Sequence, residues 1–257
     1  MASPISTTLA EIDSLKRECL GLFNDLKGFH PPASGRPTYP SIYRLLVIPL
    51  LYSSWERCFT ICNAVAWRRL REESLEANSL NSGEKSAWLM QASFYQSYIK
   101  KLLNAASLGS ESKPKKQHFP TLRQFIGELD VWLASPLDAN VDADDLVMTF
   151  SNVNEEVVEI NAEALGISTF PAFQAIKLGR LHDLVGQRNT IGHGGILSPP
   201  PSDQFDDLWV FTETLIEDYC EAFKGWLVMR FPPPPPPPSR LARVLVAAGQ
   251  MWSALTG

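Results

Sequence analysis

Hydrophobic residues recur along most of this chain at intervals of three and four, which is the spacing of one buried helical face. The clearest case covers residues 41 to 72, where the period is followed by Ile42, Leu45, Leu46, Tyr52, Trp55, Phe59 and Cys62. Similar patterns predict helices at about 8–27, 84–107, 120 onward, 155–165, 173–192 and 203–230. Alternating apolar and polar residues, the pattern of strands, are nearly absent. We therefore predict an all-α antiparallel bundle with long helices.

Capping residues and prolines refine these boundaries. Asn154 followed by two glutamates is typical of a helix start, and Gly166 is placed as a C-terminal capping glycine. Pro120 suits a first helical position, whereas Pro49 inside the 41–72 helix predicts a kink.

Three segments follow from composition. Residues 1–40 hold an extra N-terminal helix and a proline-rich crossing, and residues 41–231 form the helical domain. Residues 232–257 begin with seven prolines, which form only an extended segment, and continue with an amphipathic pattern. This C-terminal tail is a linker with a docked helix, a membrane-surface helix or a proline-motif ligand.

Charge and hydropathy exclude some classes of protein. The 257 residues are 45% hydrophobic and carry a net charge of -5, so bulk electrostatic coating of nucleic acid is excluded and any RNA contact must be local. The N-terminus lacks a signal-peptide core, and no run reaches the roughly 18 apolar residues of a membrane span. We expect a cytoplasmic protein without a membrane span.

The potential metal ligands form no convincing sequence motif. Cys58 and Cys62 lie four residues apart in a helical segment without a second ligand pair, which fits buried thiols better than zinc or a disulfide. The acidic segment 138–145 begins like a calcium loop, but Ala143 and Thr149 replace its required glycine and glutamate. We expect neither a metal nor a cofactor.

The strongest candidate chemistry lies in residues 188–193, which read RNTIGH. Arginine presents a fork of donors that matches phosphate oxygens, and histidine changes protonation near neutral pH. This combination suggests phosphodiester chemistry. On one helix Arg188 and His193 are about 140° apart. The glycines at 192, 194 and 195 predict that the helix ends there, which would help the two side chains converge.

Arg188 also continues the apolar stripe of Leu184 and Val185, so we expect it to face packed surface, where a cation needs an anion. That anion is either a phosphate or a structural carboxylate, and Glu56 is the candidate carboxylate. In the second case the motif is fortuitous, and the chain is a helical interaction protein.

The segment 181–194, LHDLVGQRNTIGHG, resembles the signature of the HEPN superfamily, which is arginine, four to six residues and histidine, often with asparagine after the arginine. Residues 50–57 are similar to an early HEPN helix that carries an acidic residue, here Glu56. Residues 151–166 are similar to a segment of one bacterial branch. The resemblance covers about residues 40–230.

The resemblance implies a helical bundle that forms a homodimer, with two copies of the motif in one cleft. Many such proteins are metal-independent endoribonucleases of toxin–antitoxin or defence systems, so the implied partners are an RNA substrate and an antitoxin or other defence-system protein. Arg188 and His193 are the implied catalytic residues, with Asn189 and Glu56 in support. Other relatives are catalytically inactive nucleotide-binding, RNA-binding or dimerisation modules, an alternative that the acidic net charge favours.

Overall fold

The computed structural model describes residues 4–29, 39–73, 76–106, 118–135, 141–150, 152–193 and 199–232. Within these ranges every regular element is a helix, which confirms the all-α prediction. The α-helices are α1 (Pro4–Phe29), α2 (Ser41–Glu72), α3 (Ser82–Gln91), α4 (Ser93–Ala106), α5 (His118–Leu133), α6 (Glu155–Leu165), α7 (Pro171–Gln174), α8 (Leu181–Gly192) and α9 (Ser202–Arg230). Short 3₁₀ helices cover Ala77–Ser79, Asp144–Leu146 and Ile167–Thr169.

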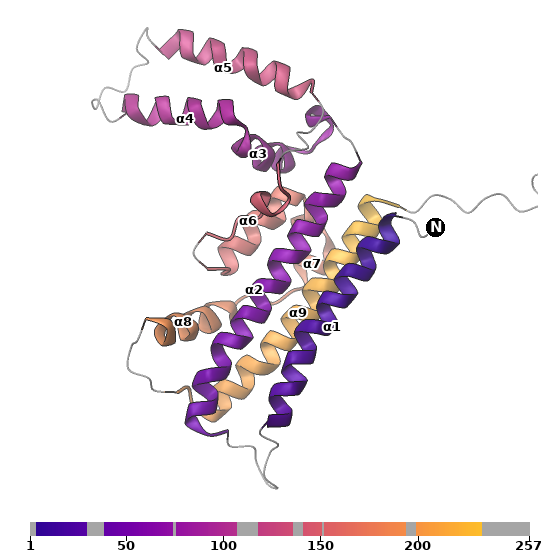
Figure 1. The fold of residues 1–257 in the computed structure, drawn as a ribbon, viewed down its shortest axis with the longest axis vertical. Helices are drawn as coiled ribbons and strands as arrows, with labels where there is room; N and C mark the ends of the chain where they lie inside the picture. Colours follow the sequence, from indigo (N-terminus) through magenta and orange to yellow (C-terminus); the bar gives the residue numbers. More distant parts are fainter. Residues whose placement is uncertain are drawn as a thin grey trace, which may run out of the picture.

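The three longest helices, α1, α2 and α9, pack side by side and form the body of the bundle (Figure 1). Ion pairs along their edges show that α1 runs antiparallel to both neighbours: Glu11–Arg68 and Glu18–Arg57 join it to α2, and Asp13–Lys224 and Lys27–Glu213 join it to α9. The smaller helices α6, α7 and α8 lie against this body, and α4 and α5 form a hairpin at one end (Figure 1).

Aromatic side chains fill the space between the long helices. Trp55 and Phe59 of α2 meet Tyr219 of α9, and all three are at most 1% exposed. Ile12 and Phe23 of α1 are fully buried in the same core. An amphipathic helix is stable only when its apolar face is covered. Residues 8–27, predicted as an N-terminal helix, lie within α1, which packs against α2 and α9.

Local capping explains why α6 begins and ends where the sequence predicts. The Asn154 side chain accepts a hydrogen bond from the Val157 N–H at 3.0 Å, which satisfies a free donor of the first turn. Gly166 ends the helix with φ of 73°, a left-handed conformation that favours glycine. This short helix places the residues before it, 147–150 and 152–153, against α2.

Two predicted helices are interrupted. The segment 84–107 breaks at Ala92, whose ψ is 129°, and the Met90 carbonyl accepts a hydrogen bond from the Gln96 side chain. The segment contains neither proline nor glycine at this break, and its helical period is continuous, so the sequence did not predict the interruption. The segment 173–192 divides into α7 and α8, and Gly179, with its low helix propensity, lies between them.

The N-terminal part of α2 differs most from the predicted burial pattern. Ile42 and Leu46 were expected in the core, but each is 64% exposed. Tyr43 and Val47 are buried instead, and the helix continues through Pro49. Part of the apolar pattern of α2 is therefore uncovered in a single chain.

By length and composition, α2 is also long and apolar enough to cross a membrane, with mean hydropathy of 1.2 in its most apolar window. Half of that window is buried inside the bundle. A core helix has the same composition, and the packing of α2 against α1 and α9 accounts for it.

Candidate active site

The candidate motif occupies the last turn of α8. Leu181, Leu184 and Val185 are buried, and α8 packs against α2. The helix ends at Gly192, and the His193 N–H donates to the Asn189 carbonyl at 2.9 Å. The last turn of α8 therefore carries Arg188 and Asn189 partly buried, followed by an exposed His193 at the end of the helix.

Arg188 is held by neutral groups. Its Nη1 donates to Asn189 Oδ1 at 3.0 Å and to Asn152 Oδ1 at 3.3 Å. The guanidinium carbon lies 5.0 Å from the centre of the Tyr52 ring. Cation–π attraction and two hydrogen bonds orient the guanidinium, but none of these partners carries a negative charge.

Tyr52 links α2 to the loop that carries Asn152. Its hydroxyl donates to Glu56 Oε1 at 3.2 Å and accepts from the Val153 N–H at 2.8 Å. Burial raises the pKa of Tyr52 to about 12, although the Val153 N–H and the charge of Arg188 act in the opposite direction. The phenol is therefore neutral at physiological pH, and it is the face of an uncharged ring that contacts Arg188.

Buried side chains hold both ends of the loop before α6, whose described residues are 147–150 and 152–153. Trp55 Nε1 donates to the Val153 carbonyl at 3.2 Å, and Asn161 bonds both the N–H and the carbonyl of Met148 at 3.0 and 2.8 Å. Between them, Phe150 adopts φ of 47° and is 68% exposed. A non-glycine residue in this conformation is strained, and such strain persists where the surroundings fix the backbone. The loop thus gives Asn152 a defined position beside α8.

Glu56 does not pair with Arg188, although the sequence allowed a structural ion pair between them. No carboxylate of the described residues forms a salt bridge with Arg188. Glu56 accepts a hydrogen bond from the Tyr52 hydroxyl instead, so Tyr52 lies between Glu56 and the guanidinium. This arrangement removes the main structural explanation for a partly buried arginine at the motif.

The structure brings together only part of the predicted site. Arg188 and Asn189 are in contact, and Glu56 reaches them through Tyr52. Among the described residues, no hydrogen bond joins the exposed His193 imidazole to either motif residue. In a single chain, therefore, the guanidinium of Arg188 is held in place, whereas the imidazole of His193 is exposed and makes no contact with it through a hydrogen bond.

Sequence reasoning missed two contributors, Tyr52 and Asn152. Tyr52 was interpreted as a core residue of α2, and Asn152 only as part of a segment of family resemblance. The available signal was the spacing of Tyr52 and Glu56, which are one helical turn apart and share a face. No local signal linked Asn152 to Arg188, because 36 residues separate them.

Two further histidines and the acidic segment 138–145 are outside the motif. His182 is exposed at the start of α8, and the side chain of His118 lies outside the described residues. Residues 138–140 of the calcium-like segment are also outside, while Asp144 and Asp145 begin a short 3₁₀ helix.

Comparison with known proteins gives one match. The family described as RiboL-PSP-HEPN matches residues 11–228. The matched region includes α1 from residue 11 onward and nearly all of α9, together with the whole of the candidate site. No curated protein and no solved structure matches the chain.

Proposed function

Because the chain belongs to the RiboL-PSP-HEPN family, we propose that it is a metal-independent endoribonuclease in which Arg188 and His193 are catalytic. The observation that carries this proposal is the environment of Arg188. Its guanidinium is partly buried, fixed by Tyr52, Asn152 and Asn189, and has no carboxylate partner in the described part of the chain. A cation fixed in this way favours an anionic ligand, and an RNA phosphate supplies one.

The reaction uses the 2′-hydroxyl of the RNA as the nucleophile. The hydroxyl oxygen attacks the adjacent phosphorus, its proton passes to a base, and the bond to the 5′-oxygen breaks. His193 accepts the first proton or donates the second to the leaving oxygen. The products are a 2′,3′-cyclic phosphate and a 5′-hydroxyl end.

Arg188 stabilises the negative charge that grows on the phosphoryl oxygens. Nη1 already donates to two asparagine oxygens, so the remaining guanidinium donors are the ones that meet the phosphate. Asn189 and Asn152 act as positioning residues for the guanidinium rather than as direct phosphate ligands. Glu56 contributes at one remove, by bonding the Tyr52 hydroxyl.

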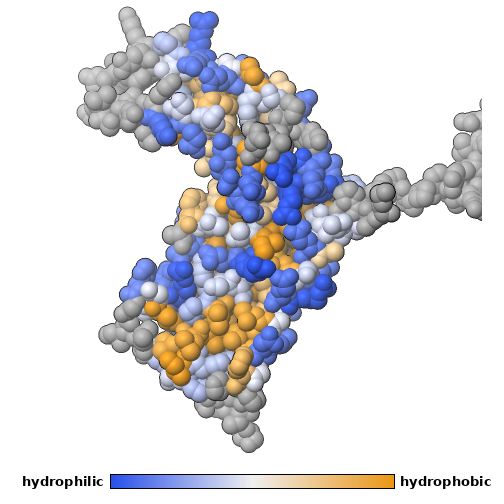
Figure 2. Space-filling model, in the orientation of Figure 1, coloured by the Kyte–Doolittle hydropathy of each residue, from blue (hydrophilic) through white to orange (hydrophobic). Residues whose placement is uncertain are grey.

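The active form in this proposal is a homodimer. His193 is exposed at a helix end, where a second copy can supply the complementary acid or base. Figure 2 shows a hydrophobic patch in the lower half of the molecule, over the part of α2 that lies beside α8. Exposed apolar side chains one turn apart, Ile42, Leu46 and Leu50, lie on this part of α2. A second chain that covers these three side chains would bury them and bring the Arg188–His193 motifs of the two chains together.

Such an enzyme fits a cytoplasmic toxin or defence effector that is restrained by an antitoxin or another defence-system protein. The second candidate is a catalytically inactive module that binds nucleotide or RNA or only dimerises. A net charge of -5 favours this alternative, because RNA binding by an acidic protein depends on a few local cations.

The decisive experiment incubates purified protein with RNA in EDTA and identifies the product ends. We expect cleavage that leaves 2′,3′-cyclic phosphates, and a loss of at least about a hundredfold in His193→Ala and Arg188→Ala. His182→Ala is the matched control, because His182 is an exposed histidine on the same helix. It should cleave like the wild type.

Two outcomes decide between the candidates. Equal cleavage by the wild type, His193→Ala and Arg188→Ala contradicts the mechanism. If the wild type dimerises and binds RNA without cutting it, and Arg188→Ala weakens that binding, the inactive module is the correct function.

A further inference from the structure

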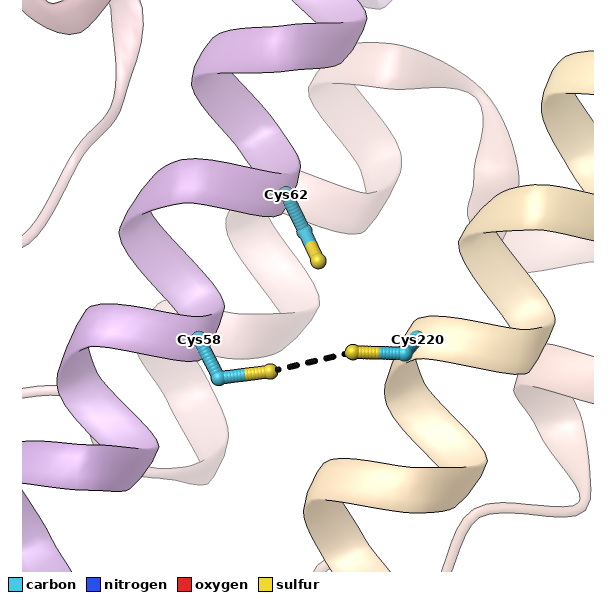
Figure 3. Close-up of side chains that lie close together, drawn as sticks. All are labelled: Cys58, Cys62 and Cys220. Atoms are coloured by element: carbon cyan, nitrogen blue, oxygen red, sulfur yellow. Dashed lines mark hydrogen bonds between the residues drawn. The ribbon is translucent and has the colours of Figure 1, made fainter. Parts of the chain in front are cut away.

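Three cysteine side chains meet in the core, away from the candidate active site. Cys58 and Cys62 lie one turn apart on α2, and their sulfurs point toward Cys220 on α9 (Figure 3). All three sulfurs lie within 4.8 Å of one another, and Cys58 and Cys220 are 3.5 Å apart. Each residue is fully buried. Cys58 and Cys62 are buried, as the sequence predicts, and the fold adds a third sulfur to the pair.

We propose that Cys58, Cys62 and Cys220 form a three-coordinate site for monovalent copper. Thiolate sulfur is a soft ligand that selects Cu(I) among biological metals. With metal–sulfur bonds of about 2.3 Å, a trigonal arrangement places sulfurs about 4.0 Å apart. The observed separations, from 3.5 Å up to at most 4.8 Å, bracket that value, so small side-chain shifts complete the site.

Zinc fits this cluster less well than Cu(I). Structural zinc takes four ligands in a tetrahedron, and a three-ligand zinc keeps a water in the fourth position. No fourth His, Cys, Asp or Glu side chain of the described residues joins the three sulfurs. Cys19, the remaining thiol, instead lies 3.6 Å from the Ser54 carbonyl, to which it donates. Full burial of the three cysteines also leaves no solvent position beside them.

A bound ion would join α2 to α9 in the middle of the bundle. Cys58 follows Glu56 by two residues on α2 and lies about 200° around the helix from it, so the cluster faces α9 and the copper proposal does not depend on the proposed ribonuclease activity. It predicts a change in stability whether or not the protein cuts RNA, because a ligand that binds only the folded chain raises its stability.

The test titrates reduced protein under nitrogen with tetrakis(acetonitrile)copper(I), in competition with bathocuproine disulfonate. We expect one Cu(I) per chain and a near-ultraviolet sulfur-to-copper charge-transfer band. Extended X-ray absorption fine structure at the copper edge should show three sulfurs at about 2.3 Å. Loss of an outer-shell partner of a metal costs about 10–100-fold in affinity, so loss of a ligand in Cys58→Ala, Cys62→Ala or Cys220→Ala should cost at least about tenfold.

Cys19→Ala is the matched control, because it removes a buried thiol of the same core that is outside the triangle. It should retain Cu(I) affinity. Equal affinity in all four variants, a requirement for Cys19 as a fourth ligand, or tighter binding of Zn(II) than of Cu(I) would each overturn the proposal. So would a fully reduced wild type that takes up no Cu(I).

A melting experiment guards against variants that fold poorly. Cu(I) should raise the Tm of the wild type and of Cys19→Ala, and leave that of Cys220→Ala unchanged. An unchanged Tm in the wild type at saturating Cu(I) would contradict a site in the folded core.

Discussion

At the scale of single residues, Tyr52 determines how the candidate site is assembled. Its ring faces Arg188, its hydroxyl bonds Glu56, and the same oxygen receives the Val153 N–H. One side chain therefore connects the helix that carries the acidic residue, the loop that carries Asn152 and the guanidinium itself. Tyr52 is a positioning residue, because it contacts Arg188 rather than the proposed substrate.

Tyr52→Phe should separate the roles of the ring and the hydroxyl. The change leaves the buried Val153 N–H without an acceptor, which costs about 1–3 kcal/mol in the free energy of unfolding. The ring still faces Arg188, so kcat/KM for RNA should fall by about tenfold or less, and Tyr52→Leu, which removes the ring as well, should lose more. Urea unfolding and steady-state cleavage measure the two effects.

Ser53→Ala is the control, since Ser53 is the exposed neighbour of Tyr52 on α2. Equal activity of the phenylalanine and leucine variants would contradict a role for the ring in positioning Arg188.

The sequence predicts the groups that bear the chemistry better than the groups that place them. Arg188, Asn189 and His193 are identified by a local motif and by what a guanidinium and an imidazole do. The contact between Arg188 and Asn152 depends on how a loop packs between two helices, and no spacing rule contains that information. For the same reason the sequence left open a direct Arg188–Glu56 pair, which the structure does not contain.

At the scale of elements, α2 shows what helical periodicity can and cannot predict. The period identified the apolar residues of α2 correctly, and Trp55 and Phe59 are in the core. It also assigned Ile42 and Leu46 to a buried face, which is exposed in one chain. Periodicity identifies a face that avoids water, but it does not specify whether the same chain or a second copy covers that face.

Leu46→Glu should therefore weaken the proposed homodimer. The leucine is 64% exposed on α2, so a charge there costs little in the monomer but is unfavourable inside an apolar interface. Light scattering after size exclusion should show a shift from dimer to monomer, with RNA cleavage reduced in parallel.

Val131→Glu on α5 is the matched control, because this valine is 68% exposed and lies on the hairpin at the other end of the molecule (Figure 1). Both variants should melt within a few degrees of the wild type. A Leu46→Glu protein that remains dimeric and active would place the interface on another face.

At the scale of the whole molecule, the bundle buries proton-bearing groups on each of its three long helices. Burial raises the pKa of Cys19 on α1 to about 11 and that of Tyr52 on α2 to about 12. It also raises the pKa of Tyr219 on α9 well above its usual value. These groups stabilise the fold only while they keep their protons, because each ionised form would lose its hydration inside the core.

The direction of the pH dependence follows from these raised values. Above the ordinary pKa of each group the unfolded chain releases its proton, while the folded chain still holds it, so the free energy of unfolding falls as pH rises. Each group contributes a slope of up to about 1.4 kcal/mol per pH unit between its two pKa values. We therefore expect stability to decline from about pH 9 toward pH 12. Lys224 adds to the trend, because its raised pKa comes first from the bond to Asp13, which is lost when the lysine is neutral.

Urea unfolding at a series of pH values measures this decline, and Cys19→Ala assigns part of it. The variant lacks one of the thiols that lose their protons first in the unfolded chain, so its slope between about pH 9 and pH 11 should be shallower, while the slope above pH 11 should match the wild type. A wild type whose stability is constant over this range would mean that water reaches these groups, and that α1, α2 and α9 do not form the closed core on which the candidate site is built.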